Sequence, residues 1–133
     1  MITDIYYVIP EIFISLSLMF LLIIGVFKKN GSAVVYNLSL LILIITIPIL
    51  LNVPSASEIL VFNESYKVDY LSIFIKILII VSTLFVLLTS SEYLKSTKIY
   101  NVEYPILILS SILGMMVMVS SNDLIVFYIG LEL

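Results

Sequence analysis

The chain has 133 residues, of which 62% are hydrophobic and 11% are charged, and its mean hydropathy is +1.28. So little polar surface cannot cover a water-soluble globule of 15.0 kDa, which places the chain in a lipid bilayer. The absence of Cys and His excludes thiolate or imidazole ligation of zinc, haem or an iron–sulfur cluster by this chain, and the net charge of −3, spread over short loops, indicates no nucleic-acid partner.

Four apolar segments are long enough to cross a membrane as helices, which need about 20 residues for the ~30 Å hydrocarbon core. The expected spans are about 8–27, 34–51, 70–89 and 104–121. Pro10 and Pro105 fall in first turns, where a missing N–H costs nothing, whereas Pro48 is expected to kink or end the second span. We therefore predict an all-α membrane protein, a multi-span transmembrane helix bundle that forms a single domain over residues 1–133.

The connection between the second and third spans, residues 52–69, is the longest. Within it, residues 59–62 and 66–68 are rich in branched and aromatic side chains and flank a polar turn, so we expect a short β-hairpin on the outer face. Two strands alone are only marginally stable, and we expect the hairpin to lean on a neighbouring subunit.

A fifth apolar run, residues 124–133, follows Ser120-Ser121-Asn122-Asp123, a cluster suited to capping a helix N-terminus. Ten residues correspond to ~15 Å of helix, about half of a bilayer. A free carboxyl terminus near the membrane midplane would be severely desolvated. We therefore expect this run to be the start of a fifth span and the chain to be the N-terminal part of a longer protein.

The lysines predict the orientation of the spans. Lys28 and Lys29 follow the first span, Lys95 and Lys98 follow the third, and the second connection has only Lys67. Because basic loops remain on the inner side, we expect the N-terminus outside and the two lysine pairs in the cytoplasm or matrix.

Glu132 is the sharpest candidate for chemistry. It lies about ten residues beyond the expected cap, and so ~15 Å deep, near mid-membrane. An ionised acid there costs at least ~2.5 kcal/mol unless it finds water, a cation or a proton. An acid with a movable basic neighbour can take up and release a proton, which is the basis of a proton relay. The alternative interpretation is that Glu132 only bonds a neighbouring helix and helps assembly.

Lys76 is the second candidate. Asp69, Lys76, Thr83 and Ser90 recur every seven residues, and each step ends only ~20° short of two full helical turns, so they form one polar stripe on the third span. Two interpretations of Lys76 stay open, a role in ion passage and a snorkelled anchor or partner of Asp69.

Two other features indicate structure rather than chemistry. Ser110, Gly114 and Ser121 line a small-residue face of the fourth span, which is typical of close helix packing. Glu11 falls in the first turn of the first span, where an acid suits the positive end of the helix dipole.

Three stretches of the sequence carry a family resemblance: "IPEIF", "VFNESYKVDYLSIFIKILI" and "EYPILILSSILGMMVMVSSNDLIVFYIGLEL". Together they resemble the N-terminal part of subunit N of the proton-translocating NADH:quinone oxidoreductase, respiratory complex I. The resemblance covers essentially the whole chain, and the third stretch is its most specific part. It implies an antiporter-like bundle in which Glu132, the glutamate of "GLEL", transfers protons, with a lysine partner from a later helix. It assigns no role to Lys76.

The resemblance also implies a non-redox subunit of an H⁺-translocating NADH:quinone reductase, in contact with other membrane subunits of complex I and with lipid, and without a nucleic-acid partner. NADH, FMN, iron–sulfur clusters and quinone are expected in other subunits, and no cofactor in this chain. The expected location is the bacterial inner membrane, with the mitochondrial inner membrane as the alternative. Alternative functions are a cation/proton antiporter or hydrogenase membrane subunit, and a non-catalytic membrane scaffold.

Overall fold

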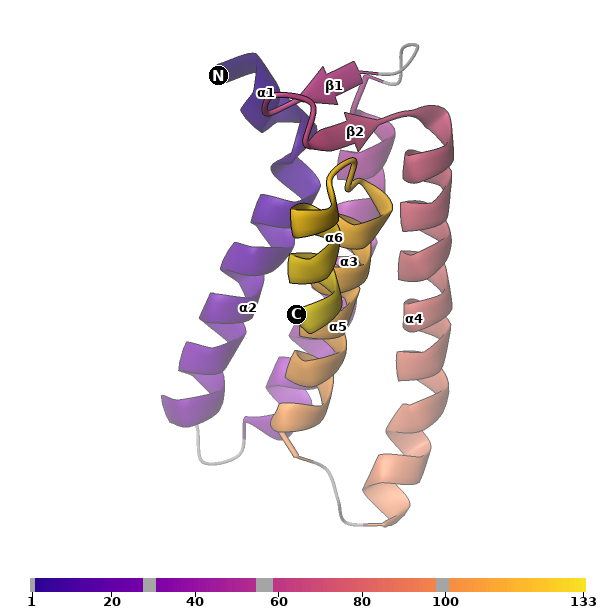
Figure 1. The fold of residues 1–133 in the computed structure, drawn as a ribbon. Helices are drawn as coiled ribbons and strands as arrows, with labels where there is room; N and C mark the ends of the chain where they lie inside the picture. The colour runs from indigo at the N-terminus through magenta and orange to yellow at the C-terminus, as the bar shows by residue number, and fades with distance from the viewer. Residues whose placement is uncertain (1, 28–30, 55–58, 98–100) are drawn as a thin grey trace.

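The computed structural model of the chain describes residues 2–27, 31–54, 59–97 and 101–133 (Figure 1). Over these residues it is a helical bundle with one small antiparallel sheet. The elements in chain order are α1 (Ile2–Tyr7), α2 (Ile9–Phe27), α3 (Ser32–Leu51), β1 (Ile59–Val61), β2 (Tyr66–Val68), α4 (Tyr70–Ser96), α5 (Glu103–Val119) and α6 (Leu124–Glu132).

Four long helices form the bundle. In Figure 1, α2, α3, α4 and α5 run along a common direction, the β-hairpin crosses one end, and α6 turns back from that end beside α5. Contacts join α2 to α3 and α5, and α4 to α3 and α5. The predicted fold class, a helix bundle with a hairpin between the second and third long helices, is confirmed.

Three of the described helices, α2, α3 and α4, are long and apolar enough to cross a membrane, and α5 is a shorter apolar helix of 17 residues. Helix α4 continues past the expected end at residue 89 and reaches Ser96, so its 27 residues extend over ~40 Å. No Gly or Pro interrupts its last turns, and its polar end carries Glu92 and Lys95. The predicted orientation rests partly on three lysines that lie outside the described residues, namely Lys28, Lys29 and Lys98.

Pro48 does not end α3 at once. The helix continues for one more turn to Leu51. The carbonyl of Pro48 then accepts hydrogen bonds from the backbone N–H and the side-chain amide of Asn52, at 3.1 and 2.9 Å. These bonds satisfy a carbonyl that the end of a helix would otherwise leave free.

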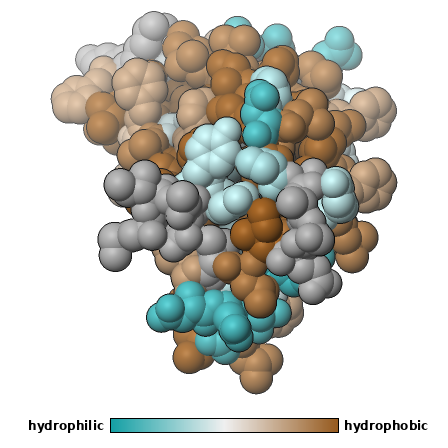
Figure 2. Space-filling view, turned by 90° about the horizontal axis from the view of Figure 1, so that it is seen from above, coloured by the Kyte–Doolittle hydropathy of each residue, from teal (hydrophilic) through white to brown (hydrophobic). Residues whose placement is uncertain are grey.

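Apolar side chains occupy both the interior and the outside of the bundle. Only 28–33% of each long apolar helix is buried, while Leu16, Phe74 and Phe85 are 63–69% exposed. Figure 2, seen from the hairpin end, shows hydrophobic side chains along much of the outline. Large exposed apolar surfaces of this kind are typical of proteins whose solvent is lipid. The interior is filled by Ile14, Leu21, Val35, Leu43, Leu50, Ile80, Leu87, Leu109, Ile112 and Met116.

The hairpin packs against its own chain. Its strands pair in the register Ile59 to Val68, and three residues of the turn, 62–64, have positive φ values of 53–68°. The side-chain amide of Asn122 donates to the carbonyl of Glu64 at 2.7 Å, and its backbone N–H donates to the carbonyl of Ser65 at 3.0 Å. The turn between α5 and α6 thus supports the hairpin from within the chain, and contact with a neighbouring subunit stays a prediction.

Candidate functional site

A buried ion pair joins the first and third long helices just beneath the hairpin. The ammonium of Lys76 lies 2.6 Å from Oε1 of Glu11. The hydroxyl of Tyr66 donates to the same carboxylate oxygen at 2.7 Å and accepts a hydrogen bond from Lys76 at 2.9 Å. Exposed fractions are 2% for Lys76, 4% for Glu11 and 7% for Tyr66. We call these three residues the ion-pair cluster.

Helical periodicity explains why Lys76 faces inward. The buried residues of α4 include Ser72, Lys76, Ile80 and Thr83, which recur every three or four residues along one face. The predicted polar stripe therefore lies inside the bundle. Further along it, the hydroxyl of Ser90 lies 3.2 Å from that of Tyr36 on α3.

Asp69 is not the partner of Lys76. Its carboxylate accepts the backbone N–H of Ser72 at 2.8 Å, while the hydroxyl of Ser72 accepts the N–H of Asp69 at 3.0 Å. This reciprocal pair caps the start of α4. The hydrogen bond from Ser72 holds the pKa of Asp69 below its ordinary value, and Lys67, at 3.5 Å, acts in the same direction.

The chemistry of the ion-pair cluster follows from its burial. Burial first, and then the negative charge of Glu11, raise the pKa of Tyr66 far above its ordinary value, so the phenol stays protonated and donates. Glu11 lies in the first turn of α2, as expected, and it is also the counter-ion of Lys76, which the sequence did not predict. The cluster joins α2, α4 and β2.

Glu132 lies at the end of α6. The carboxylate accepts a hydrogen bond from the hydroxyl of Tyr128, one turn earlier, at 2.6 Å, and the side chain is exposed. The nine residues of α6 correspond to ~13 Å of helix, and Figure 1 shows the helix ending partway along α5. Asp123 occupies the N-cap position, but its side chain makes no capping bond. In the part of the chain that the structure describes, no hydrogen bond or ion pair joins Glu132 to Lys76.

Two glycines set the position of α6 against α5. A Cβ atom added to Gly114 would lie 2.6 Å from the carbonyl oxygen of Gly130, and one added to Gly130 would lie 2.9 Å from the carbonyl oxygen of Gly114. Gly114 thus makes the close packing expected of the small-residue face, whereas the hydroxyl of Ser110 donates to its own helix at the carbonyl of Leu107. The part of Gly130 in this contact was not predicted from the sequence.

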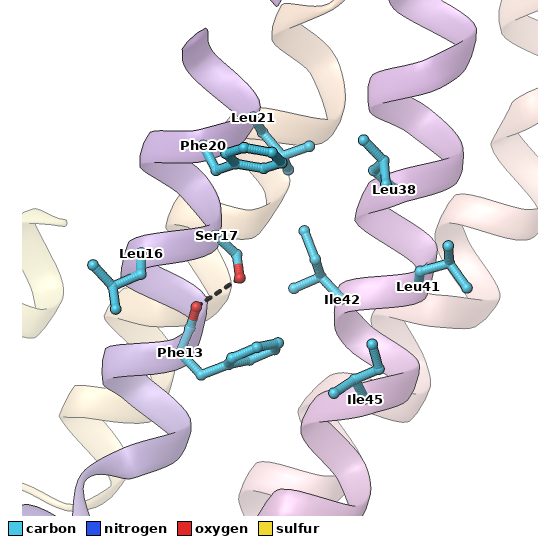
Figure 3. A pocket seen from close by; sticks show the side chains of 9 residues that line it. All are labelled: Phe13, Leu16, Ser17, Phe20, Leu21, Leu38, Leu41, Ile42 and Ile45. Carbon is cyan, nitrogen blue, oxygen red and sulfur yellow. Dashed lines mark hydrogen bonds between the residues drawn. The ribbon is translucent and has the colours of Figure 1, made fainter. Parts of the chain in front are cut away.

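A groove of about 460 Å³ lies between α2 and α3 (Figure 3). Its single hydroxyl, on Ser17, donates to the carbonyl of Phe13 at 2.7 Å, as the dashed line in Figure 3 shows. The groove therefore offers no free polar group for catalysis. Among the described residues, no group of three or more acidic side chains could hold a metal ion. The residues that line the groove are Phe13, Leu16, Ser17, Phe20, Leu21, Leu38, Leu41, Ile42 and Ile45.

Comparisons with known proteins identify relatives along nearly the whole chain, although no protein-family model matches it. The chain is 60% identical over 127 residues to NADH-quinone oxidoreductase subunit N of Pelagibacter ubique, covering 96% of this chain and 27% of that protein. It is 35% identical over 130 residues to the protein of the same name from Paramagnetospirillum magneticum, covering 98% and 27%. It is 34% identical over 126 residues to the chloroplastic NAD(P)H-quinone oxidoreductase subunit 2 of Mesostigma viride, covering 94% and 25%. The chain spans about a quarter of the length of these relatives.

Proposed function

The chain belongs to the family of NADH-quinone oxidoreductase subunit N, and on this premise we propose that it forms part of a membrane-arm subunit that translocates protons during electron transfer from NADH to quinone. The subunit itself carries out no redox chemistry. NADH, FMN, iron–sulfur clusters and quinone bind to other subunits of the complex. The chain lies in the bacterial inner membrane with its N-terminus outside, in contact with lipid and other membrane subunits.

Glu132 is the residue that carries this proposal. An acid about nine residues along a helix that starts at the hairpin end lies well below the membrane surface, where an ionised carboxylate is costly. The exposed side of α6 leaves its carboxylate open to a basic partner, which the family resemblance places on a later helix. The hydroxyl of Tyr128 donates a hydrogen bond to this carboxylate and orients it.

Lys76 has no step in this proton path. Its ammonium is already held by Glu11 and by Tyr66 at the hairpin end of the bundle. We assign it a structural role within the ion-pair cluster.

Replacement of Glu132 by Gln in the full-length subunit tests the proposal. We expect proton pumping by the assembled complex to fall ~10-fold or more, because an amide cannot carry the proton, and Glu132→Asp to retain more activity than Glu132→Gln. The matched control is Glu92→Gln, the same change at an exposed acid near the end of α4, which should pump normally. Unchanged pumping per electron in Glu132→Gln would exclude the role.

A membrane scaffold is the second candidate, favoured by the way the ion-pair cluster ties α2, α4 and the hairpin together. If the chain were only a scaffold, Glu132→Gln would lower the amount or the thermal stability of the complex and leave pumping per assembled complex intact. A cation/proton antiporter is distinguished by ion exchange without any dependence on NADH.

A further inference from the structure

Two polar atoms in and beside the ion-pair cluster have no hydrogen-bond partner among the described residues. They are Oε2 of Glu11 and the hydroxyl oxygen of Ser120, at the end of α5. Glu11 is 4% exposed and Ser120 is fully buried. A buried carboxylate oxygen that accepts no hydrogen bond is costly, and such atoms are commonly satisfied by ordered water.

The hairpin brings the side chains that carry these two atoms to Tyr66. The backbone N–H of Lys67 donates to the carbonyl of Ser120 at 2.8 Å, and Tyr66 forms a β-bridge with Ser121. The Ser120 hydroxyl consequently lies near enough to the phenol of Tyr66 to act on its pKa, but outside hydrogen-bond geometry. The same phenol donates to Oε1 of Glu11 at 2.7 Å. The carboxyl group of Glu11 and the side chain of Ser120 therefore both lie beside one tyrosine hydroxyl.

The charge of the cluster limits what can bind there. Lys76 and Glu11 neutralise each other, so an added cation or anion would leave a net charge buried beneath the hairpin. The lysine ammonium has three N–H donors, of which Glu11 and Tyr66 use two. A free N–H, a free carboxylate oxygen and a free hydroxyl require a neutral ligand that both donates and accepts. Water is the smallest molecule with these properties.

We propose that Glu11, Lys76 and Ser120 form an internal hydration site that holds one water molecule. The water donates to Oε2 of Glu11 and bonds the hydroxyl of Ser120 and the third N–H of Lys76. It thereby extends the ion pair to the turn between α5 and α6, so that one polar network joins α2, α4, the hairpin and α5. Buried waters of this kind occur about once per 27 residues and usually make about three hydrogen bonds. The site is separate from Glu132 and does not depend on proton transfer there.

A structure of the full-length protein in its natural assembly, at a resolution that shows ordered water, tests this site. We expect density for one water within hydrogen-bond distance of Glu11 Oε2 and the Ser120 hydroxyl. The Ser120→Ala variant should lose this density and keep the contact between Glu11 and Lys76. In the matched control, Ser121→Ala, the density should remain, because the hydroxyl of Ser121 already donates to the carbonyl of Met118 at 2.7 Å.

Infrared spectroscopy gives a second measurement, for which no structure of the variants has to be determined. An internal water should give an O–H stretching band that shifts in H₂¹⁸O, is present in the native protein and Ser121→Ala, and is missing in Ser120→Ala. A dry site in the native protein, or a direct hydrogen bond between Ser120 and Glu11 with nothing between them, would overturn the proposal. The native measurement decides the question even if Ser120→Ala does not assemble.

Discussion

Glu11 and Lys76 show how a charge pair survives inside a membrane bundle. Each charge alone would be costly at this depth, but the contact of 2.6 Å and the shared hydroxyl of Tyr66 replace much of the lost hydration. Lys76 is 2% exposed and Glu11 is 4% exposed. Removing one of two such buried charges leaves the other without a partner, and this uncompensated charge causes most of the loss of stability.

Replacing Lys76 by Met should therefore destabilise the protein strongly, by ~3 to 5 kcal/mol in the free energy of unfolding. The double variant Glu11→Gln, Lys76→Met removes both charges and should recover a large part of this loss. Thermal or denaturant unfolding of the full-length protein in detergent measures both, with Lys95→Met at an exposed position of the same helix as the control. If the losses of stability in Lys76→Met and in Glu11→Gln alone simply add up in the double variant, the two residues are not coupled.

At the scale of residues, the sequence could predict which face of the helix carries Lys76, but not that Glu11 is its partner. The spacing of Lys76 and Thr83 follows from helix geometry, which is local. Glu11 is 65 residues away in the chain, and no periodicity relates the two positions. Tyr66 went unnoticed because an aromatic residue in a strand is ordinary, and its role depends on how the hairpin is folded onto the bundle.

At the scale of elements, the contact between α5 and α6 decides where Glu132 lies. The two helices meet at Gly114 and Gly130, where each backbone carbonyl occupies the space that a Cβ atom of the facing residue would need. Close backbone approach of this kind compensates for the weak hydrophobic drive between helices in lipid.

Gly114→Ala and Gly130→Ala should each push α6 away from α5 and lower stability by ~1 to 3 kcal/mol, because backbone atoms cannot move aside cheaply. Gly25→Ala is the comparison variant, since its added Cβ would lie 2.5 Å from a side-chain atom, Cγ1 of Val102, and not from a backbone atom. Thermal unfolding of the full-length protein compares the three variants. Equal losses of stability in Gly25→Ala and Gly114→Ala would show that the contact with backbone atoms is not the reason why Gly114 resists substitution.

The elements themselves were largely predictable, and their connections were less so. Long apolar runs and a polar turn between branched residues indicate helices and a hairpin through local chemistry alone. Hydrophobicity bounds the expected third span at about residue 89, whereas the helix itself continues into polar residues as far as Ser96. The anchoring of the hairpin by Asn122 was also missed, since Asn122 was interpreted as part of a helix cap.

At the scale of the whole molecule, the bundle has two chemically different ends. In Figure 1 the hairpin and the turn between α5 and α6 form one end, and the polar end of α4 lies at the other. The ion-pair cluster belongs to the hairpin end, because Tyr66 is part of β2. Between them the outward surface is largely apolar. We therefore expect a bilayer to surround the middle of the bundle and to leave these two ends in opposite aqueous compartments.

The distribution of lysines predicts which end faces which compartment, and single cysteines can test it because the chain has none. Leu60→Cys places a thiol on a 45% exposed hairpin position, and Ser96→Cys places one at the end of α4. A membrane-impermeant maleimide should label Leu60→Cys in intact cells and Ser96→Cys only in inverted vesicles, with total labelling of the unfolded protein as the control for reactivity. The reverse pattern would invert the orientation. Labelling of both from one side would contradict the membrane-spanning arrangement, because α4 joins the two positions and can separate them only by crossing the bilayer.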